Sequence, residues 1–159
     1  MRRALLFLAV IGLSAAASAQ LRLPTIIPRA PPPPALVGID ALRAEFIARS
    51  GSSIVYFGGD SSVLTPPARA TLAAQAQWLR QHPEVVIRIE GHADQSDTRD
   101  HALAVGARRA QEVRDYLILL GVPAPQITTL SWGKERIAVQ GTSLDALARN
   151  RRAETVLVR

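Results

Sequence analysis

The segment that constrains the fold most is residues 100–120, which the sequence predicts to be a long, one-sided helix. Apolar and small residues recur there at steps of three and four positions, as Leu103, Gly106, Ala110, Val113, Leu117 and Leu120. This spacing forms a continuous stripe along a helix of 3.6 residues per turn, and the Gly121 that follows is typical of a helix end. A helix with such a stripe buries it against another layer of secondary structure.

Four short apolar segments are predicted to be the strands of that other layer: residues 53–57, 85–90, 127–132 and 153–158. In the second segment, apolar Ile87 and Ile89 alternate with charged Arg88 and Glu90. Alternation of this kind predicts a strand with one buried face and one partly wet face.

Helices are predicted between the strands and before the first of them. A leading helix is expected over residues 39–49, and another begins at Thr65, where Thr can cap and the two following prolines fit the first turn. A short helix is expected over residues 143–150. Strands joined by crossover helices either pair in parallel or leave a gap for another strand. The order predicts an α/β (α+β) two-layer sandwich, with helices on one face of a mixed sheet.

The first 19 residues have the composition of a secretory signal peptide. Arg2 and Arg3 precede the apolar run 4–13, and small residues at 17–19 suit cleavage after Ala19. The alternative is an uncleaved N-terminus that dips into a membrane. Residues 20–35 contain four consecutive prolines and are predicted to be a stiff linker, or alternatively a proline-rich ligand for a partner. The folded domain is therefore expected over residues 36–159.

Composition restricts the class of function. Aromatic residues make up 4% of the chain and its net charge of +6 is spread along the sequence, which argues against nucleic-acid binding. The apolar run near the N-terminus is too short to span a bilayer, so no transmembrane segment is expected in the mature chain. The sequence contains no cysteine, and bacterial lipoproteins are lipidated on one. The expectation is an exported periplasmic protein without a lipid anchor.

A candidate binding site follows the second predicted strand. Asp94 closes the segment Gly91-His92-Ala93-Asp94, and Arg109 follows fifteen residues later on the long helix. At 100° per residue, Arg109 borders the apolar stripe, whereas Arg108 points to water. A carboxylate and a guanidinium at one rim of the sheet suit a small zwitterion, since Asp would hold an ammonium and Arg a carboxylate. The alternative is an Asp94–Arg109 salt bridge with no ligand.

Metal-binding and catalytic interpretations have weaker support. The histidines His82, His92 and His101 lack a third ligand at a convincing spacing, so no metal site is predicted. Ser131, His92 and Asp94 resemble a hydrolase triad in composition, but no nucleophile elbow surrounds the serine. The expectation is a non-catalytic protein that needs no cofactor.

A series of short motifs resembles a known family. In order, they are residues 55–58 (Val-Tyr-Phe-Gly), 89–94 (Ile-Glu-Gly-His-Ala-Asp), 106–110 (Gly-Ala-Arg-Arg-Ala), 121–122 (Gly-Val), 131–135 (Ser-Trp-Gly-Lys-Glu) and 150–153 (Asn-Arg-Arg-Ala). Together, over about residues 50–159, they resemble the OmpA-like domains that bind peptidoglycan. Within that family they are most similar to the peptidoglycan-associated lipoproteins.

The resemblance implies the two-layer sandwich and a non-catalytic function. Members of the family hold the diaminopimelate residue of the cell-wall stem peptide, whose side chain ends in an ammonium and a carboxylate. By resemblance, Asp94 and Arg109 are the pair that holds this zwitterion, and Arg151 is a further binding or bracing arginine. The main chain of Gly58, Gly59 and Asp60 matches a loop that contributes contacts, and Ser96 occupies a small polar position.

The sequence departs from the family pattern at two positions near the site. Ala102 and Ala104 stand where the family usually has Asn and Ser, so a hydrogen bond near the ligand is expected to be lost. The lipidated cysteine is also missing. These departures leave a second hypothesis open, that of a protein-interaction module of the envelope, such as a Tol-system partner, with weakened or lost peptidoglycan binding.

Overall fold

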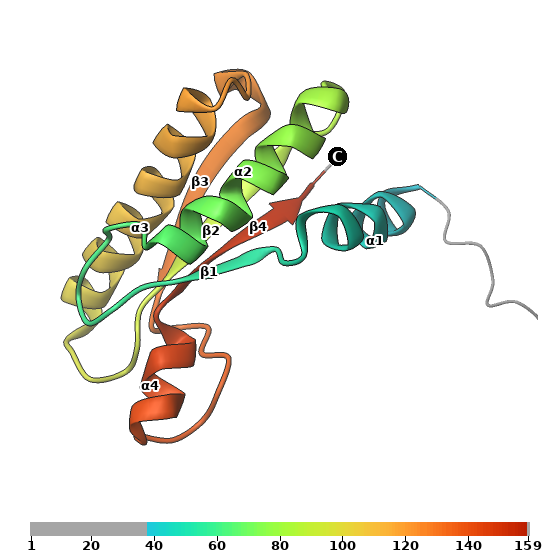
Figure 1. The fold of residues 1–159 in the computed structure, drawn as a ribbon. Helices are drawn as coiled ribbons and strands as arrows, with labels where there is room; N and C mark the ends of the chain where they lie inside the picture. The colour runs from blue at the N-terminus through green and yellow to red at the C-terminus, as the bar shows by residue number, and fades with distance from the viewer. Residues whose placement is uncertain (1–37, 159) are drawn as a thin grey trace, which may run out of the picture. The chain divides into compact units, whose positions relative to one another are not determined.

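The computed structural model describes residues 38–158, so the predicted signal peptide and the whole predicted linker (residues 20–35) lie outside the described residues. Figure 1 shows the elements in chain order. They are α1 (Ile39–Ser50), β1 (Ile54–Tyr56), α2 (Pro66–Gln81), β2 (Ile87–His92), α3 (Arg99–Leu119), a single 3-10 turn (Ala124–Gln126), β3 (Ile127–Gly133), α4 (Leu144–Asn150) and β4 (Arg152–Leu157).

The four strands form one mixed sheet in the order β1-β4-β2-β3. β2 and β3 are parallel and joined by the crossover helix α3, whereas β4 lies between β1 and β2 and is antiparallel to both. Strands joined by crossover helices were expected either to pair in parallel or to leave a gap for another strand, and both cases occur. β2 and β3 pair in parallel, whereas β1 and β2 are separated by β4.

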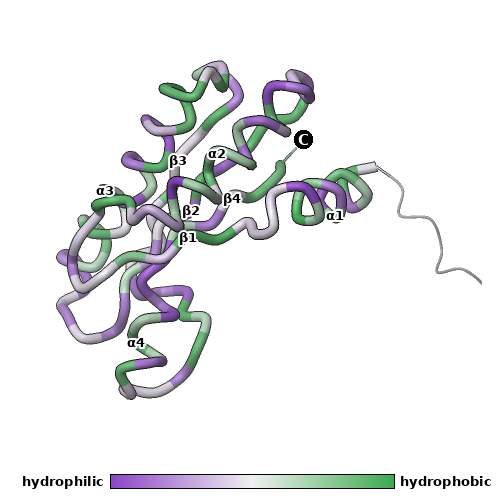
Figure 2. The backbone as a smooth tube through the Cα atoms, in the orientation of Figure 1, coloured by the Kyte–Doolittle hydropathy of each residue, from purple (hydrophilic) through white to green (hydrophobic). Residues whose placement is uncertain are grey.

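Helices α2 and α3 cover one face of the sheet (Figure 1). The core lies between these helices and the sheet, where Ile87 and Ile89 of β2 and Leu72 and Leu117 of the helices are fully buried. Figure 2 shows hydrophobic and hydrophilic residues alternating along α3, as expected of a helix with one buried stripe. The predicted two-layer sandwich is confirmed.

The predicted helix ends agree with local hydrogen bonding. The Thr65 side chain caps α2 by accepting from the Ala68 amide, and Thr98 caps α3 in the same way. Gly121 follows α3 with a φ of 90°, a left-handed conformation that glycine adopts without strain.

On the face of the sheet opposite the helices, Glu90 is less exposed than the alternation of apolar and charged residues predicts. Glu90 is only 6% exposed, and its carboxylate accepts hydrogen bonds from the Arg88 side chain and from the Trp132 indole. The guanidinium of Arg136 lies 3.6 Å from the Trp132 ring centroid and covers it.

Several loops lie together at one end of the sheet because of the directions of the four strands. β1, β2 and β3 end there and β4 begins there, since β4 is antiparallel to its neighbours. Helix α4 lies at this end, beyond the strands (Figure 1). The loops 57–65, 93–98 and 134–143 therefore belong to this end of the sheet.

Candidate functional site

Arg109 lies at this end of the sheet, on the inner side of α3. It is fully buried, and its three nitrogens donate to main-chain carbonyls: Nε to Ser61 (3.0 Å), Nη1 to His92 (2.7 Å) and Nη2 to Gly59. Its carbon Cζ lies 5.3 Å from the Phe57 ring centroid. One guanidinium thus joins α3 to the β1–α2 loop and to the end of β2.

Arg109 remains charged at neutral pH despite its burial. Burial lowers the pKa of Arg109 to about 10, while the carboxylates of Asp60 and Asp94 act in the opposite direction. Three of the five N–H groups of the guanidinium donate to these carbonyls, and the burial of the side chain keeps the guanidinium away from solvent.

Asp94 lies directly after β2 and is held by its own loop. Its Oδ1 accepts hydrogen bonds from the Ser96 amide (2.9 Å) and the Ser96 hydroxyl. Burial raises the pKa of Asp94, but the Ser96 hydrogen bonds and the charges of Arg151 and Arg109 outweigh it, so the pKa lies below its usual value. Asp94 is therefore a fixed, ionised carboxylate.

The ion pair of Asp94 in the described part of the chain is with Arg151. Arg151 Nε lies 3.4 Å from Asp94 Oδ2, and this buried nitrogen makes no hydrogen bond to any described residue. The Arg151 backbone is fixed at the end of α4, because its carbonyl accepts from the Phe57 amide at 2.8 Å. A charged donor with unused hydrogen-bonding capacity therefore lies beside the carboxylate.

The structure brings the predicted site residues to one end of the sheet but pairs them differently from the sequence-based hypothesis. Asp94 bonds Ser96 and faces Arg151, whereas Arg109 bonds main-chain carbonyls. The exposed Gly58–Asp60 segment adjoins the site, since the Gly59 carbonyl accepts a hydrogen bond from Arg109. Among the described residues, the salt bridge is Asp94–Arg151 rather than the Asp94–Arg109 alternative.

Asn150 is a residue whose role the sequence did not indicate. It is fully buried, its Oδ1 accepts from the amides of Ala138 and Val139, and its amide nitrogen donates to Gln95. These bonds join the β3–α4 loop to the loop that carries Asp94, and they hold Arg151 in place. The Asn150-Arg151-Arg152 motif was the feature of the sequence that could have indicated this role. The hydrogen-bond partners of Asn150 are distant in sequence, so the motif alone did not identify them.

Ala102, where the family has an amide, is fully buried against Ala93 and Val105. The side chain at this position contributes packing in place of a hydrogen bond. Ala104 is exposed, so it leaves no buried polar group unpaired.

The triad interpretation does not match the geometry. The Ser131 hydroxyl donates to the Leu103 carbonyl at 2.7 Å, on the helix side of the sheet. His92 is buried, and neither of its ring nitrogens has a hydrogen-bond partner among the described residues. Burial, with the charge of Arg152, lowers the pKa of His92 to about 4, so the ring is neutral.

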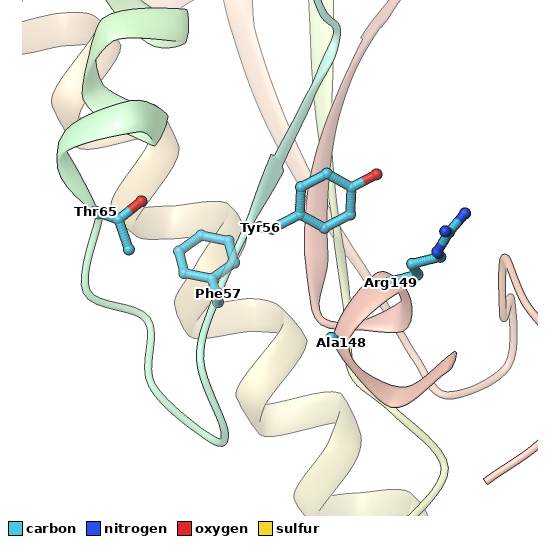
Figure 3. Close-up of a pocket in the computed structure, with 5 residues that line it drawn as sticks. All are labelled: Tyr56, Phe57, Thr65, Ala148 and Arg149. Atoms are coloured by element: carbon cyan, nitrogen blue, oxygen red, sulfur yellow. The ribbon is translucent and has the colours of Figure 1, made fainter. Parts of the chain in front are cut away.

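A separate cavity of about 530 Å³ lies between the end of β1 and α4 (Figure 3). Its walls are formed by Tyr56, Phe57, Thr65, Ala148 and Arg149. Arg149 is already paired with Asp145 at 3.0 Å. This cavity therefore lacks the juxtaposed, partly unsatisfied charges that Asp94 and Arg151 present.

The fold and the site define a two-layer domain that presents a carboxylate and a guanidinium at one end of its sheet. The OmpA family profile matches residues 56–151, which run from the last residue of β1 to the residue before β4. The chain belongs to the OmpA family.

Its curated relatives include proteins named peptidoglycan-associated lipoprotein. The chain is 47% identical over 115 residues to the one from Rhizobium meliloti (strain 1021), across 72% of this chain and 65% of that protein. It is 45% identical to the one from Agrobacterium fabrum, across 72% of this chain and 64% of that protein. The chain thus spans slightly less than two thirds of the length of these relatives, and neither they nor the family carries an enzymatic name.

Solved structures agree on the fold. The peptidoglycan-associated lipoprotein from Burkholderia pseudomallei matches with a TM-score of 0.66 and 38% identity, over 68% of this chain and 92% of that one. The C-terminal domain of Helicobacter pylori MotB matches with a TM-score of 0.63 at 22% identity, over 67% of this chain and 84% of that one, which shows the fold alone. No helix among residues 38–158 is long and apolar enough to cross a membrane.

Proposed function

We propose that this protein is a non-catalytic peptidoglycan-binding module of the periplasm that recognises the side-chain zwitterion of diaminopimelate in the stem peptide. The observation that carries the proposal is the Asp94–Arg151 pair. A fixed carboxylate lies 3.4 Å from a guanidinium nitrogen that has no hydrogen-bond partner among the described residues. An ammonium and a carboxylate on one carbon complement this pair with opposite signs.

Each side chain then has a separate role. Asp94 holds the ammonium on Oδ2, since Oδ1 is occupied by Ser96. Arg151 holds the carboxylate, and Arg109 adds positive charge while it fixes the Gly59–Ser61 main chain at the site. The exposed amides of Gly58, Gly59 and Asp60 supply the main-chain contacts. Binding to the wall requires export, so the proposal includes the predicted signal peptide.

The experiment is co-sedimentation of the purified protein with purified sacculi, with free diaminopimelate as competitor. Asp94→Asn and Arg151→Gln should each weaken binding about tenfold or more, because each removes a charge-assisted hydrogen bond. The matched controls are Asp115→Asn and Arg149→Gln, which remove exposed charges that are paired with Arg114 and Asp145, respectively. Circular dichroism establishes that each variant is folded.

Sacculi with lysine at the third stem position provide a sharper comparison. Lysine keeps the ammonium but lacks the adjacent carboxylate, so it should bind weakly to the wild-type protein. Equal binding to both wall types, or full binding by a folded Asp94→Asn variant, would contradict zwitterion recognition at this pair.

Interaction with another envelope protein is a second candidate, favoured by the helix-free face of the sheet. This face carries Tyr56, which is 49% exposed, and the Arg136–Trp132 stack. Aromatic and arginine side chains are enriched in protein interfaces. If this face binds a partner, Tyr56→Ser and Arg136→Ser should reduce recovery of that partner from periplasm without changing sacculus binding.

A further inference from the structure

Three side chains distant in sequence converge at the rim of the site and form a mixed imidazole–carboxylate cluster. His101 is in the first turn of α3, Asp97 is in the loop before that helix, and Asp60 is in the β1–α2 loop. His101 Nε2 lies 3.1 Å from Asp60 Oδ2 and 3.8 Å from Asp97 Oδ2. The three ligand atoms lie within 4.8 Å of one another.

We propose that Asp60, Asp97 and His101 bind a divalent transition-metal ion of the zinc class. In a tetrahedral zinc site, bonds of about 2.0–2.2 Å place neighbouring ligand atoms about 3.3 Å apart. The separation of 3.1 Å to Asp60 Oδ2 is about 0.2 Å below that value, and the separation of 3.8 Å to Asp97 Oδ2 is about 0.5 Å above it. One imidazole nitrogen and two carboxylate oxygens form a ligand set that zinc accepts, with a water in the fourth position.

The direction of the two carboxylates distinguishes this cluster from an ordinary charge network. Both face the same nitrogen of His101, so one ion can contact all three groups. His82 also has two carboxylate neighbours, but Glu84 approaches its Nδ1 at 3.3 Å and Glu45 approaches its Nε2 at 4.0 Å. One ion cannot take both ring nitrogens, which makes His82 a matched contrast within the same chain.

The backbones that carry the three ligands are already fixed. Arg109 holds the carbonyls on both sides of Asp60, namely those of Gly59 and Ser61. Lys134 donates to the Asp97 carbonyl, and the His101 amide donates to the Thr98 side chain. Ligands that are positioned before the ion arrives lose little freedom when it binds.

A bound ion would join the β1–α2 loop to the loop that carries Asp94. These loops contribute Asp60 and Asp97, respectively, and His101 contacts both of these carboxylates. The proposed metal site uses the side-chain carboxylate of Asp60, whereas the proposed peptidoglycan contact uses the Asp60 amide, and Asp94 and Arg151 are not among the metal ligands.

The test is calorimetric titration of zinc into the metal-free purified protein. Wild type and His82→Gln should bind one equivalent, while His101→Gln and Asp60→Asn should bind at least about tenfold more weakly. The melting temperature should rise with zinc concentration in the first two proteins and not in the last two.

Nuclear magnetic resonance provides a readout that does not depend on any variant. In protein labelled with ¹⁵N at histidine, zinc should shift the Nε2 resonance of His101 and leave the resonances of His82 unchanged. The proposal is overturned if wild type binds no equivalent of zinc, if a folded His101→Gln variant binds as tightly as wild type, or if His82 shifts in place of His101.

Discussion

Arg109 is the largest of the fully buried side chains among the described residues, and it carries a charge. Its cost of desolvation is offset by hydrogen bonds to three main-chain carbonyls. Its neighbour Arg108 is exposed, as the helical spacing predicted. The two adjacent arginines therefore differ in their contribution to stability.

Arg109→Met should lower the free energy of unfolding by about 3 kcal/mol or more, because it leaves three carbonyls without their charged donor. Arg108→Met should change it by about 0.5 kcal/mol or less, because an exposed side chain is removed. Urea denaturation of both variants measures the difference. Equal effects would mean that the buried hydrogen bonds contribute little net stability.

The buried His92 should make the free energy of unfolding depend on pH between about 4 and 6.5, a range that extends above the ordinary pKa of carboxylates. Its pKa is about 4 in the folded protein and 6.5 in the unfolded chain. Between these values the unfolded state binds the proton and the folded state does not, so stability is lost as pH falls. The His92 contribution should decrease by about 2 kcal/mol from pH 7 to pH 5.

Urea denaturation at a series of pH values measures this loss. The His92→Gln variant should show a shallower dependence than wild type between pH 7 and pH 5. An unchanged slope in His92→Gln would assign the pH dependence to other groups.

At the scale of elements, β2 and α3 approach so closely that their backbones touch. A Cβ atom at Gly91 would lie 1.9 Å from the Gly106 carbonyl oxygen, and one at Gly106 would lie 2.8 Å from the Gly91 carbonyl oxygen. A Cβ at Gly106 would also meet the Ser131 Oγ at 2.4 Å. Because the two carbonyl oxygens belong to the backbone, a larger residue at either glycine displaces the helix from the sheet.

Gly91→Ala should destabilise the protein by about 3 kcal/mol, because overpacking against a backbone cannot be relieved by a rotamer change. Gly58→Ala is the control, since a Cβ there meets no atom within 4 Å. Thermal or urea unfolding compares the two. A Gly91→Ala variant as stable as the control would show that α3 can move away without loss.

At the scale of the whole molecule, the two tryptophans report on different parts of the domain. Trp78 is in the core beside Phe46, with ring centroids 5.2 Å apart, whereas Trp132 lies on the helix-free face. Because one core joins the sheet to its helices, both regions should unfold in a single transition.

Single-tryptophan variants, Trp78→Phe and Trp132→Phe, test this cooperativity. In each variant, the fluorescence transition of the remaining tryptophan should coincide with the circular dichroism transition in urea. A fluorescence transition of Trp132 at lower urea than the dichroism transition would identify the end of the sheet as a separate, less stable unit.

Local patterns predicted the elements well, because their causes are local. The apolar stripe of residues 100–120 predicted α3, and the alternation of residues 85–90 predicted a strand that the structure places slightly later, at Ile87–His92. Caps such as Thr65 and the stop at Gly121 involve hydrogen bonds within a few residues. Spacing along the chain is sufficient to predict such features.

Contacts between residues distant in the sequence were harder to predict from the sequence alone. The sequence predicted that Asp94 and Arg109 lie at one end of the sheet, and both do. It did not predict that Arg151 faces Asp94, or that Arg109 bonds the Gly59 and Ser61 carbonyls. These partners lie on separate loops, so no periodicity along the chain relates them.

The sequence by itself determined the order of elements, the buried faces and the family, because these depend on local spacing and on motifs read in order. Only the tertiary structure decided which charges meet. Inserting β4 between β1 and β2 brings Arg151, the residue just before β4, beside Asp94. The same closure brings Asp60 to His101 from forty-one residues away. Contacts of this kind arise from how the sheet is assembled, which no short segment encodes.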